Sequence, residues 1–173
     1  MNIYPWQKNA WSEVFSNKDK MPHAHIFYGA QTLEINRFVG ELIKSVLCSQ
    51  PTEDNFACRE CQDCLWSETS HPDLKVVERG PDKDEKLNSD ILNIANAREV
   101  KKFLELTSHQ ANGKKIVVIY DAERLNVAAS NALLKTIEEP PNNCLIILTV
   151  NNLANLLPTI TSRCRLISLT NPS

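Results

Sequence analysis

The stretch that decides the fold is IVVIYDAE, residues 116–123, together with LIILTV at residues 145–150. Both contain unbroken apolar runs, without the alternation of a strand that has one face in water. Such runs are typical of central strands in a parallel sheet that helices cover on both faces. Each therefore predicts a buried strand, and the first ends at the polar residues Asp121 and Glu123.

Shorter apolar runs predict three more strands, and stretches with helical spacing predict the helices between them. The further strands are expected at residues 24–28, 74–77 and 166–169. The helices are expected at residues 6–15, 34–47 and 91–106. Strands that alternate with helices imply right-handed βαβ units. The sequence therefore predicts an α/β fold with a mainly parallel, five-stranded sheet flanked by helices.

The composition is that of an ordinary globular domain. The chain has 173 residues, of which 42% are hydrophobic and 23% charged, and its net charge is −2. This length suits one domain with a sizeable core. A slightly negative chain has no overall positive field that would hold it on nucleic acid. The sequence contains neither a signal-peptide pattern nor an apolar window long enough to span a membrane, so we expect a cytoplasmic protein.

The turn after the first strand is the place where a sheet of this kind would bind phosphate. A P-loop would continue from Gly29 with a second glycine, a lysine and a hydroxyl residue. The sequence has Glu34, Ile35 and Asn36 at these three positions. Losing the three together removes the close backbone approach, the cation for the β- and γ-phosphates and the Mg²⁺ ligand. The segment is either a degenerate P-loop that does not bind ATP or an ordinary strand-to-helix turn.

Asp121 ends the third strand, where a Walker B aspartate would hold Mg²⁺. The next residue should then be a glutamate that orients the attacking water, but it is Ala122. The acidic Glu123 comes one place later and would point elsewhere. We interpret the pair as a degenerate Walker B motif, with an ordinary turn residue or helix N-cap as the alternative reading of Asp121.

Four of the six cysteines have the spacing of a metal site. They are Cys48, Cys58, Cys61 and Cys64. Four thiolates suit a closed, tetrahedral and therefore structural Zn²⁺ site, which would stabilise an insert too polar to bury a core of its own. An iron–sulfur cluster uses similar spacing, and unligated thiols are the third reading.

The motifs of the second half resemble, in this order, those of the clamp-loader branch of the AAA+ ATPases. The matching segments are DAERL at 121–125, NALLKTIEEPP at 131–141, LIILT at 145–149 and LPTITSRC at 157–164. The resemblance extends over essentially the whole chain. It implies the three-layer AAA+ fold, RecA-like and of the P-loop NTPase class, over residues 1–170, with a zinc-binding insert at residues 48–64. The small helical lid and the collar that follow in the family would be absent from this chain.

The resemblance also implies a role. In this family the arginine of the Ser-Arg-Cys motif reaches the γ-phosphate held by a neighbouring subunit, so Arg163, flanked by Ser162 and Cys164, would be a trans arginine finger. The decayed nucleotide motifs beside it imply a non-catalytic stator in the clamp loader of bacterial DNA polymerase III, which supports ATP-driven loading of the sliding clamp onto primed DNA. Its partners would be the gamma/tau ATPase subunits and the delta subunit, and the clamp and DNA indirectly. Zn²⁺ would be its cofactor, and an iron–sulfur cluster is not expected in this family.

Two other functions stay open at this point. One is an active, gamma/tau-like ATPase subunit of the same machine, which the residues at 34–36 and Ala122 disfavour. The other is a zinc-dependent nucleic-acid-binding domain, against which the lack of a strongly basic composition counts. On the leading reading the chain is no enzyme on its own but a component of a DNA-directed DNA polymerase holoenzyme.

Overall fold

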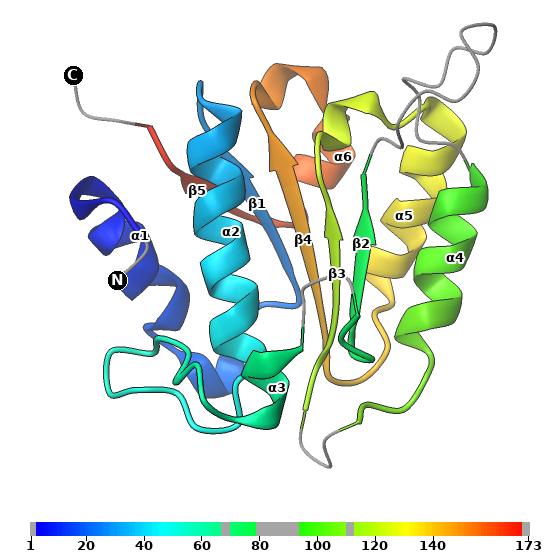
Figure 1. The fold of residues 1–173 in the computed structure, drawn as a ribbon. Helices are drawn as coiled ribbons and strands as arrows, with labels where there is room; N and C mark the ends of the chain where they lie inside the picture. Colours follow the sequence, from blue (N-terminus) through cyan, green and yellow to red (C-terminus); the bar gives the residue numbers. More distant parts are fainter. Residues whose placement is uncertain (1–2, 67–69, 79–93, 110–112, 171–173) are drawn as a thin grey trace, which may run out of the picture.

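A computed structural model describes residues 3–66, 70–78, 94–109 and 113–170. Five parallel strands form one sheet in the order β2-β3-β4-β1-β5 (Figure 1). The strands are β1 (Ala24–Tyr28), β2 (Leu74–Val77), β3 (Lys115–Ile119), β4 (Cys144–Val150) and β5 (Arg165–Ser168). The predicted parallel sheet and its strand positions are thus confirmed, with boundaries that shift by about one residue.

Helices and short 3-10 turns connect the strands. The α-helices are α1 (Lys8–Phe15), α2 (Thr32–Leu47), α3 (Gln62–Leu65), α4 (Ile94–Leu104), α5 (Val127–Glu138) and α6 (Pro158–Thr161). The 3-10 turns are η1 (Pro5–Gln7), η2 (Lys18–Lys20), η3 (Ala122–Arg124) and η4 (Leu153–Asn155). The first residues of the helix expected at 91–106 lie outside the described part. Within the described ranges, no helix has the length and apolarity needed to cross a bilayer.

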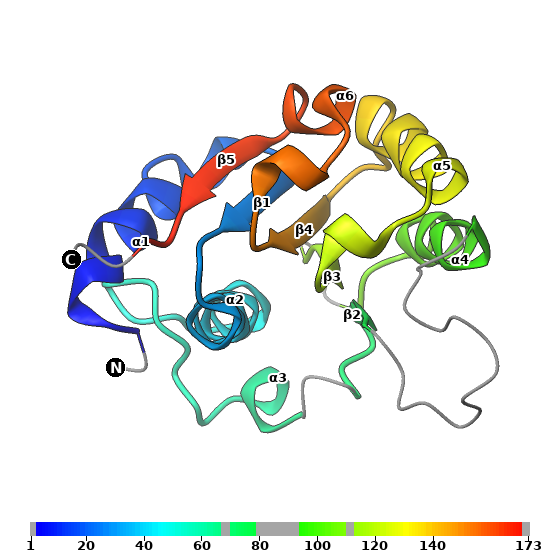
Figure 2. The same cartoon turned by 90° about the horizontal axis from the view of Figure 1, so that it is seen from above.

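The sheet is the middle of three layers (Figure 2). Helices α1 and α2 pack on one face and α4, α5 and α6 on the other, each over its own buried apolar cluster. Along β3, Ile116 and Val118 point into the first cluster, whereas Val117 and Ile119 point into the second. All four are at most 2% exposed, which explains why this strand has no polar alternation.

Neighbouring strands β1 and β4 send the chain to opposite sides of the sheet. After β1 the chain enters α2 on one face, and after β4 it enters η4 and α6 on the other. Their carboxyl ends therefore border the crevice in which open α/β sheets bind ligands. Figure 2 looks down on this edge.

Candidate functional site

Gly29, the glycine that follows β1, lies against the end of β5. A Cβ atom at this position would come within 3.3 Å of the carbonyl carbon and oxygen of Leu169. Such a contact is tighter than a side chain tolerates without movement of the neighbouring backbone. The close approach of two chain segments is thus a sufficient reason for glycine here, without any bound phosphate.

The three residues at the remaining P-loop positions belong to the first turns of α2. Ile35 is 2% exposed and packs in the apolar cluster under α1 and α2, so the place of the phosphate-binding lysine is part of the core. Glu34 puts a carboxylate in the first turn, where the positive end of the helix dipole would otherwise attract an anion. Asn36 buries its Oδ1, which accepts no hydrogen bond from any described residue.

The same turn is tied to the end of β4. Thr32, the first residue of α2, donates a hydrogen bond from its hydroxyl to Oδ1 of Asn151, at 2.8 Å. Thr32 and Asn151 are 119 residues apart in the chain. The hydrogen bond therefore links the first turn of α2 to the loop that follows β4, across the crevice.

Asp121 and Ala122 also have structural roles. Asp121 adopts a left-handed conformation with φ of 53°, and its backbone N–H donates to Thr149 Oγ1 at 3.1 Å. Its carboxylate lies 4.0 Å from Nε of Arg124. Ala122 is fully buried. Thr149 thus holds the turn after β3.

Glu123, two residues after Asp121, is engaged as well. Its two carboxylate oxygens accept hydrogen bonds from the backbone N–H groups of Asn151 and Asn152, at 3.3 and 3.4 Å. The carboxylate therefore braces the loop after β4. Neither the contact of Thr149 nor that of Glu123 was foreseen from the sequence, because each depends on a partner from another strand.

Arg163 follows α6, and this helix lies on the opposite face of the sheet from α2 (Figures 1 and 2). Its Nε makes an ion pair with Glu138 Oε1 at 2.7 Å, and its Nη1 donates to the carbonyl oxygen of Thr159 and to Ser162 Oγ at 3.1 and 3.3 Å. The Arg163 and Glu138 side chains are 43% and 42% exposed. The arginine is therefore accessible from outside while held by its own chain.

Cys164, the last residue of the Ser-Arg-Cys motif, is half-buried beside the second apolar cluster. Burial raises the pKa of its thiol to about 11. Since the thiolate is the reactive and metal-binding form, burial lowers the reactivity of this cysteine at neutral pH.

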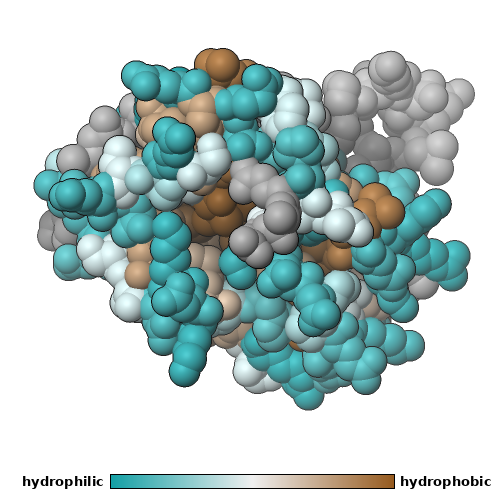
Figure 3. Space-filling view, turned by 90° about the horizontal axis from the view of Figure 1, so that it is seen from below, coloured by the Kyte–Doolittle hydropathy of each residue, from teal (hydrophilic) through white to brown (hydrophobic). Residues whose placement is uncertain are grey.

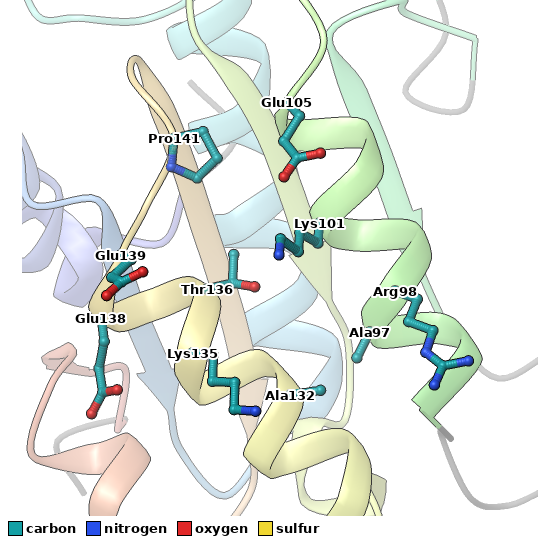
Figure 4. Close-up of a pocket in the computed structure, with 10 residues that line it drawn as sticks. All are labelled: Ala97, Arg98, Lys101, Glu105, Ala132, Lys135, Thr136, Glu138, Glu139 and Pro141. Atoms are coloured by element: carbon teal, nitrogen blue, oxygen red, sulfur yellow. The ribbon is translucent and has the colours of Figure 1, made fainter.

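A groove of about 690 Å³, lined largely by charged residues, lies on the surface between α4 and α5. Its lining carries cations from both helices, Arg98, Lys101 and Lys135, and carboxylates at the end toward Glu138. Figure 4 shows Glu138 at the end of α5, with its carboxylate directed toward the α6 side and away from α4. The groove is thus not a catalytic cleft around Glu138, because that carboxylate is turned to Arg163.

The cysteines of the insert form a compact cluster. The insert lies at the end of the sheet opposite to the carboxyl ends of the strands (Figure 1). The Sγ atoms of Cys48, Cys58, Cys61 and Cys64 all lie within 4.8 Å of one another. Two of the separations are 3.8 Å (Cys48 to Cys61) and 3.9 Å (Cys58 to Cys64). A tetrahedral zinc with Zn–S bonds of about 2.3 Å places its sulfurs about 3.8 Å apart. The arrangement therefore fits one four-coordinate metal ion.

The surroundings of the cluster shift the pKa of its thiols in both directions. Backbone N–H groups of Gln50 and Cys58 donate to Cys48 Sγ, at 3.4 and 3.3 Å. Burial raises the pKa of Cys61, but hydrogen bonds from Ser49 and Cys64 outweigh it and bring the pKa down to about 6. Burial raises the pKa of Cys48 and Cys64. A metal ion would have to displace these remaining protons, so its affinity should rise with pH.

His71, near the insert, is not part of the metal centre. Its Nδ1 accepts the backbone N–H of Asp73 at 3.0 Å, which leaves Nε2 to donate to the Asp63 carboxylate at 3.1 Å. The ring thus joins the insert to the start of β2. Figure 3 views this end of the molecule, which is mostly hydrophilic with apolar side chains in recesses.

Comparisons with known proteins agree with the resemblance seen in the sequence. The family model described as "DNA polymerase III, delta subunit" matches residues 7–173. The chain is 35% identical over 164 residues to the DNA polymerase III subunit delta' of Pseudomonas aeruginosa, a match that covers 94% of this chain and 47% of that protein. It is 31% identical over 176 residues to the Escherichia coli protein of the same name, covering 99% and 50%. The chain thus spans about half the length of these relatives.

Two solved structures share the fold. A DNA polymerase III gamma subunit-related protein from Thermotoga maritima superposes with a TM-score of 0.65 at 22% identity, over 96% of this chain and 47% of that one. The RuvB Holliday junction branch migration motor of the same organism superposes with a TM-score of 0.56 at 12% identity, over 96% and 45%. The three-layer AAA+ architecture expected from the sequence is therefore confirmed.

Proposed function

The chain belongs to the DNA polymerase III delta' family, and we propose that it acts as a non-catalytic stator of the clamp loader, which supports ATP-driven loading of a sliding clamp onto primed DNA. The observation that carries this proposal is an asymmetry between two sites. Glu34, Ile35 and Asn36 replace the phosphate- and magnesium-binding side chains of a P-loop, and Ala122 replaces the Walker B glutamate, whereas Arg163 is exposed and oriented. A subunit with this asymmetry assists the hydrolysis of ATP by another subunit instead of hydrolysing ATP itself.

In this role Arg163 is a trans arginine finger, with Ser162 and Cys164 forming its turn. A guanidinium is planar and permanently charged, so it can neutralise charge that develops on a transferring phosphoryl group. The exposure of Arg163 supports this assignment, because a finger must reach an atom of another chain. Its partners would be the gamma/tau ATPase subunits and the delta subunit, with the clamp and DNA contacted through the assembly.

The remaining parts of the proposal concern the chain itself. Residues 1–170 form the AAA+ nucleotide-binding-like domain, the insert at residues 48–64 holds one structural Zn²⁺, and the lid and collar belong to the rest of the full-length protein. The four clustered sulfurs support the metal assignment. We place the complex in the cytoplasm, where replication takes place.

The absence of nucleotide binding is tested by calorimetry of ATP and ATPγS with Mg²⁺ on this chain. We expect no binding heat up to millimolar nucleotide, because Ile35 is buried in the core and Glu34 repels the phosphates. Micromolar binding would instead identify an active ATPase subunit.

The finger is tested in the assembled loader with the full-length subunit carrying Arg163→Ala. Turnover at the neighbouring ATPase site should fall by roughly a thousandfold or more, the scale of other arginine fingers. Arg165→Ala is the matched control, because Arg165 is paired with Glu13 at 3.3 Å on the β5 edge. Equal rates for the two variants would refute the assignment of Arg163.

A further inference from the structure

The guanidinium of Arg163 is held on two sides. Glu138, the last residue of α5, binds its Nε at 2.7 Å. Around α6, the Thr159 carbonyl and the Ser162 hydroxyl both accept from Nη1. Arginine has five N–H donors, one on Nε and two on each terminal nitrogen. The N–H groups on Nε and Nη1 are therefore engaged, whereas Nη2 makes no hydrogen bond to any residue that the structure describes.

The geometry leaves Nη2 for an acceptor outside the chain. From these contacts we infer that Glu138 is a positioning residue for Arg163: it holds the guanidinium in the orientation that presents Nη2 to a phosphate oxygen of the neighbouring subunit. This inference rests on the proposed function, because it assumes that Arg163 acts in trans.

The local structure makes Glu138 suitable for this task. It is the last helical residue of α5, and Glu139 and Pro140 follow in a non-helical corner. The corner fixes the backbone from which the carboxylate reaches α6, and Figure 4 shows the side chain pointing that way. Glu139, next in the chain, makes no ion pair with a described residue. Of these two adjacent carboxylates, only Glu138 makes an ion pair with Arg163, so Glu139 can serve as its control.

The exposure of the pair argues against a mainly structural role. An ion pair in which both side chains are more than 40% exposed contributes little to stability. Its effect is instead on the freedom of the arginine, since a long side chain loses many rotamers when it is held in one geometry. Holding it before the neighbour binds lowers that cost in the catalytic step, and because an exposed pair holds the side chain only weakly, the gain in rate is about two- to fivefold.

The experiment compares Glu138→Ala, Glu138→Gln and Glu139→Ala in the assembled loader, each with and without Arg163→Ala. We expect Glu138→Ala to slow turnover at the neighbouring site about two- to fivefold, with no change in the KM for ATP. Glu138→Gln should recover most of the loss, because its amide oxygen still accepts from Nε. Glu139→Ala should behave as wild type. In the Arg163→Ala background, Glu138→Ala should have no further effect.

Three outcomes would overturn the inference. Wild-type turnover in Glu138→Ala would show that the pair is dispensable, and faster turnover would show that Glu138 restrains the finger instead. An equal loss with and without Arg163 would show that Glu138 acts elsewhere. If Arg163→Ala itself had no effect, the proposed function would fail first, so the two failures are distinguishable.

Discussion

Removing the metal ion should loosen the cysteine insert without unfolding the sheet. The perturbation is Cys58→Ser, which takes away one of the four clustered sulfurs. The apolar clusters on both sides of the sheet lie mainly outside the insert, so the five strands should remain. The cost should therefore appear as local loosening and reduced stability, not as loss of the fold.

The contacts between the insert and the first two helices set the size of the effect. Phe56 stacks on Trp11 with ring centroids 4.6 Å apart, and the Trp11 indole N–H donates to the Asp54 carbonyl at 3.0 Å. Arg59 binds the buried carboxylate of Glu41 at 3.0 Å. A stack and a hydrogen bond are worth about 1 kcal/mol each, and a half-exposed arginine on a buried carboxylate about 1 to 2 kcal/mol. Losing them together costs about 3 to 4 kcal/mol.

For a domain of this size that loss lowers Tm by roughly 10 °C. Because Trp11 loses its stacking partner, its fluorescence should shift to the red when a chelator removes the metal or when Cys58 is replaced. Metal analysis by mass spectrometry should find one zinc per wild-type chain and much less in the variant. The control is Cys164→Ser, which lies outside the cluster. A full complement of zinc and an unchanged Tm in Cys58→Ser would refute the reasoning, and bound iron would indicate an iron–sulfur site.

Two further predictions concern buried charge. Lys115 pairs with Asp73 at 3.2 Å, and both side chains are buried. Lys115→Met should leave the Asp73 carboxylate without its cation and lower the free energy of unfolding, measured with urea, by about 3 kcal/mol. A loss below about 1 kcal/mol would mean that the other hydrogen bonds of Asp73 suffice. Burial, helped by nearby positive charge, lowers the pKa of His25 to about 4, so the unfolded chain binds the extra proton first. Stability should then fall by about 2 kcal/mol from pH 7 to pH 5. That part of the fall should vanish in His25→Phe, and an equal pH dependence of both proteins would contradict the assignment.

The architecture could be predicted from the sequence because the burial of a strand or helix determines the pattern of apolar residues along it. The run at residues 116–120 has no polar alternation, and β3 is indeed covered on both faces. The spacing of Cys58, Cys61 and Cys64 likewise predicted the cluster, because residues this close in the chain keep their sulfur atoms close in space. In both cases the informative residues are close together in the chain.

The polar contacts between distant segments could not be predicted in this way. No pattern in the sequence indicates that Glu138 pairs with Arg163. The hydrogen bond between Thr32 and Asn151 spans 119 residues. Hydrophobic patterning indicates which face of an element is buried, but it does not specify which polar side chains meet when the elements pack.

These distant contacts bear on why a chain without phosphate-binding side chains can keep the shape of an ATPase. In an active site the polar groups at the carboxyl edge would be completed by nucleotide and metal. Here several of them are completed by the chain: Thr32 by Asn151, the N–H of Asp121 by Thr149, and Glu123 by the backbone after β4. Polar groups that are paired within the chain need no ligand to satisfy their hydrogen bonds. The edge is thus braced by contacts within the chain, which is consistent with the proposed role as a stator.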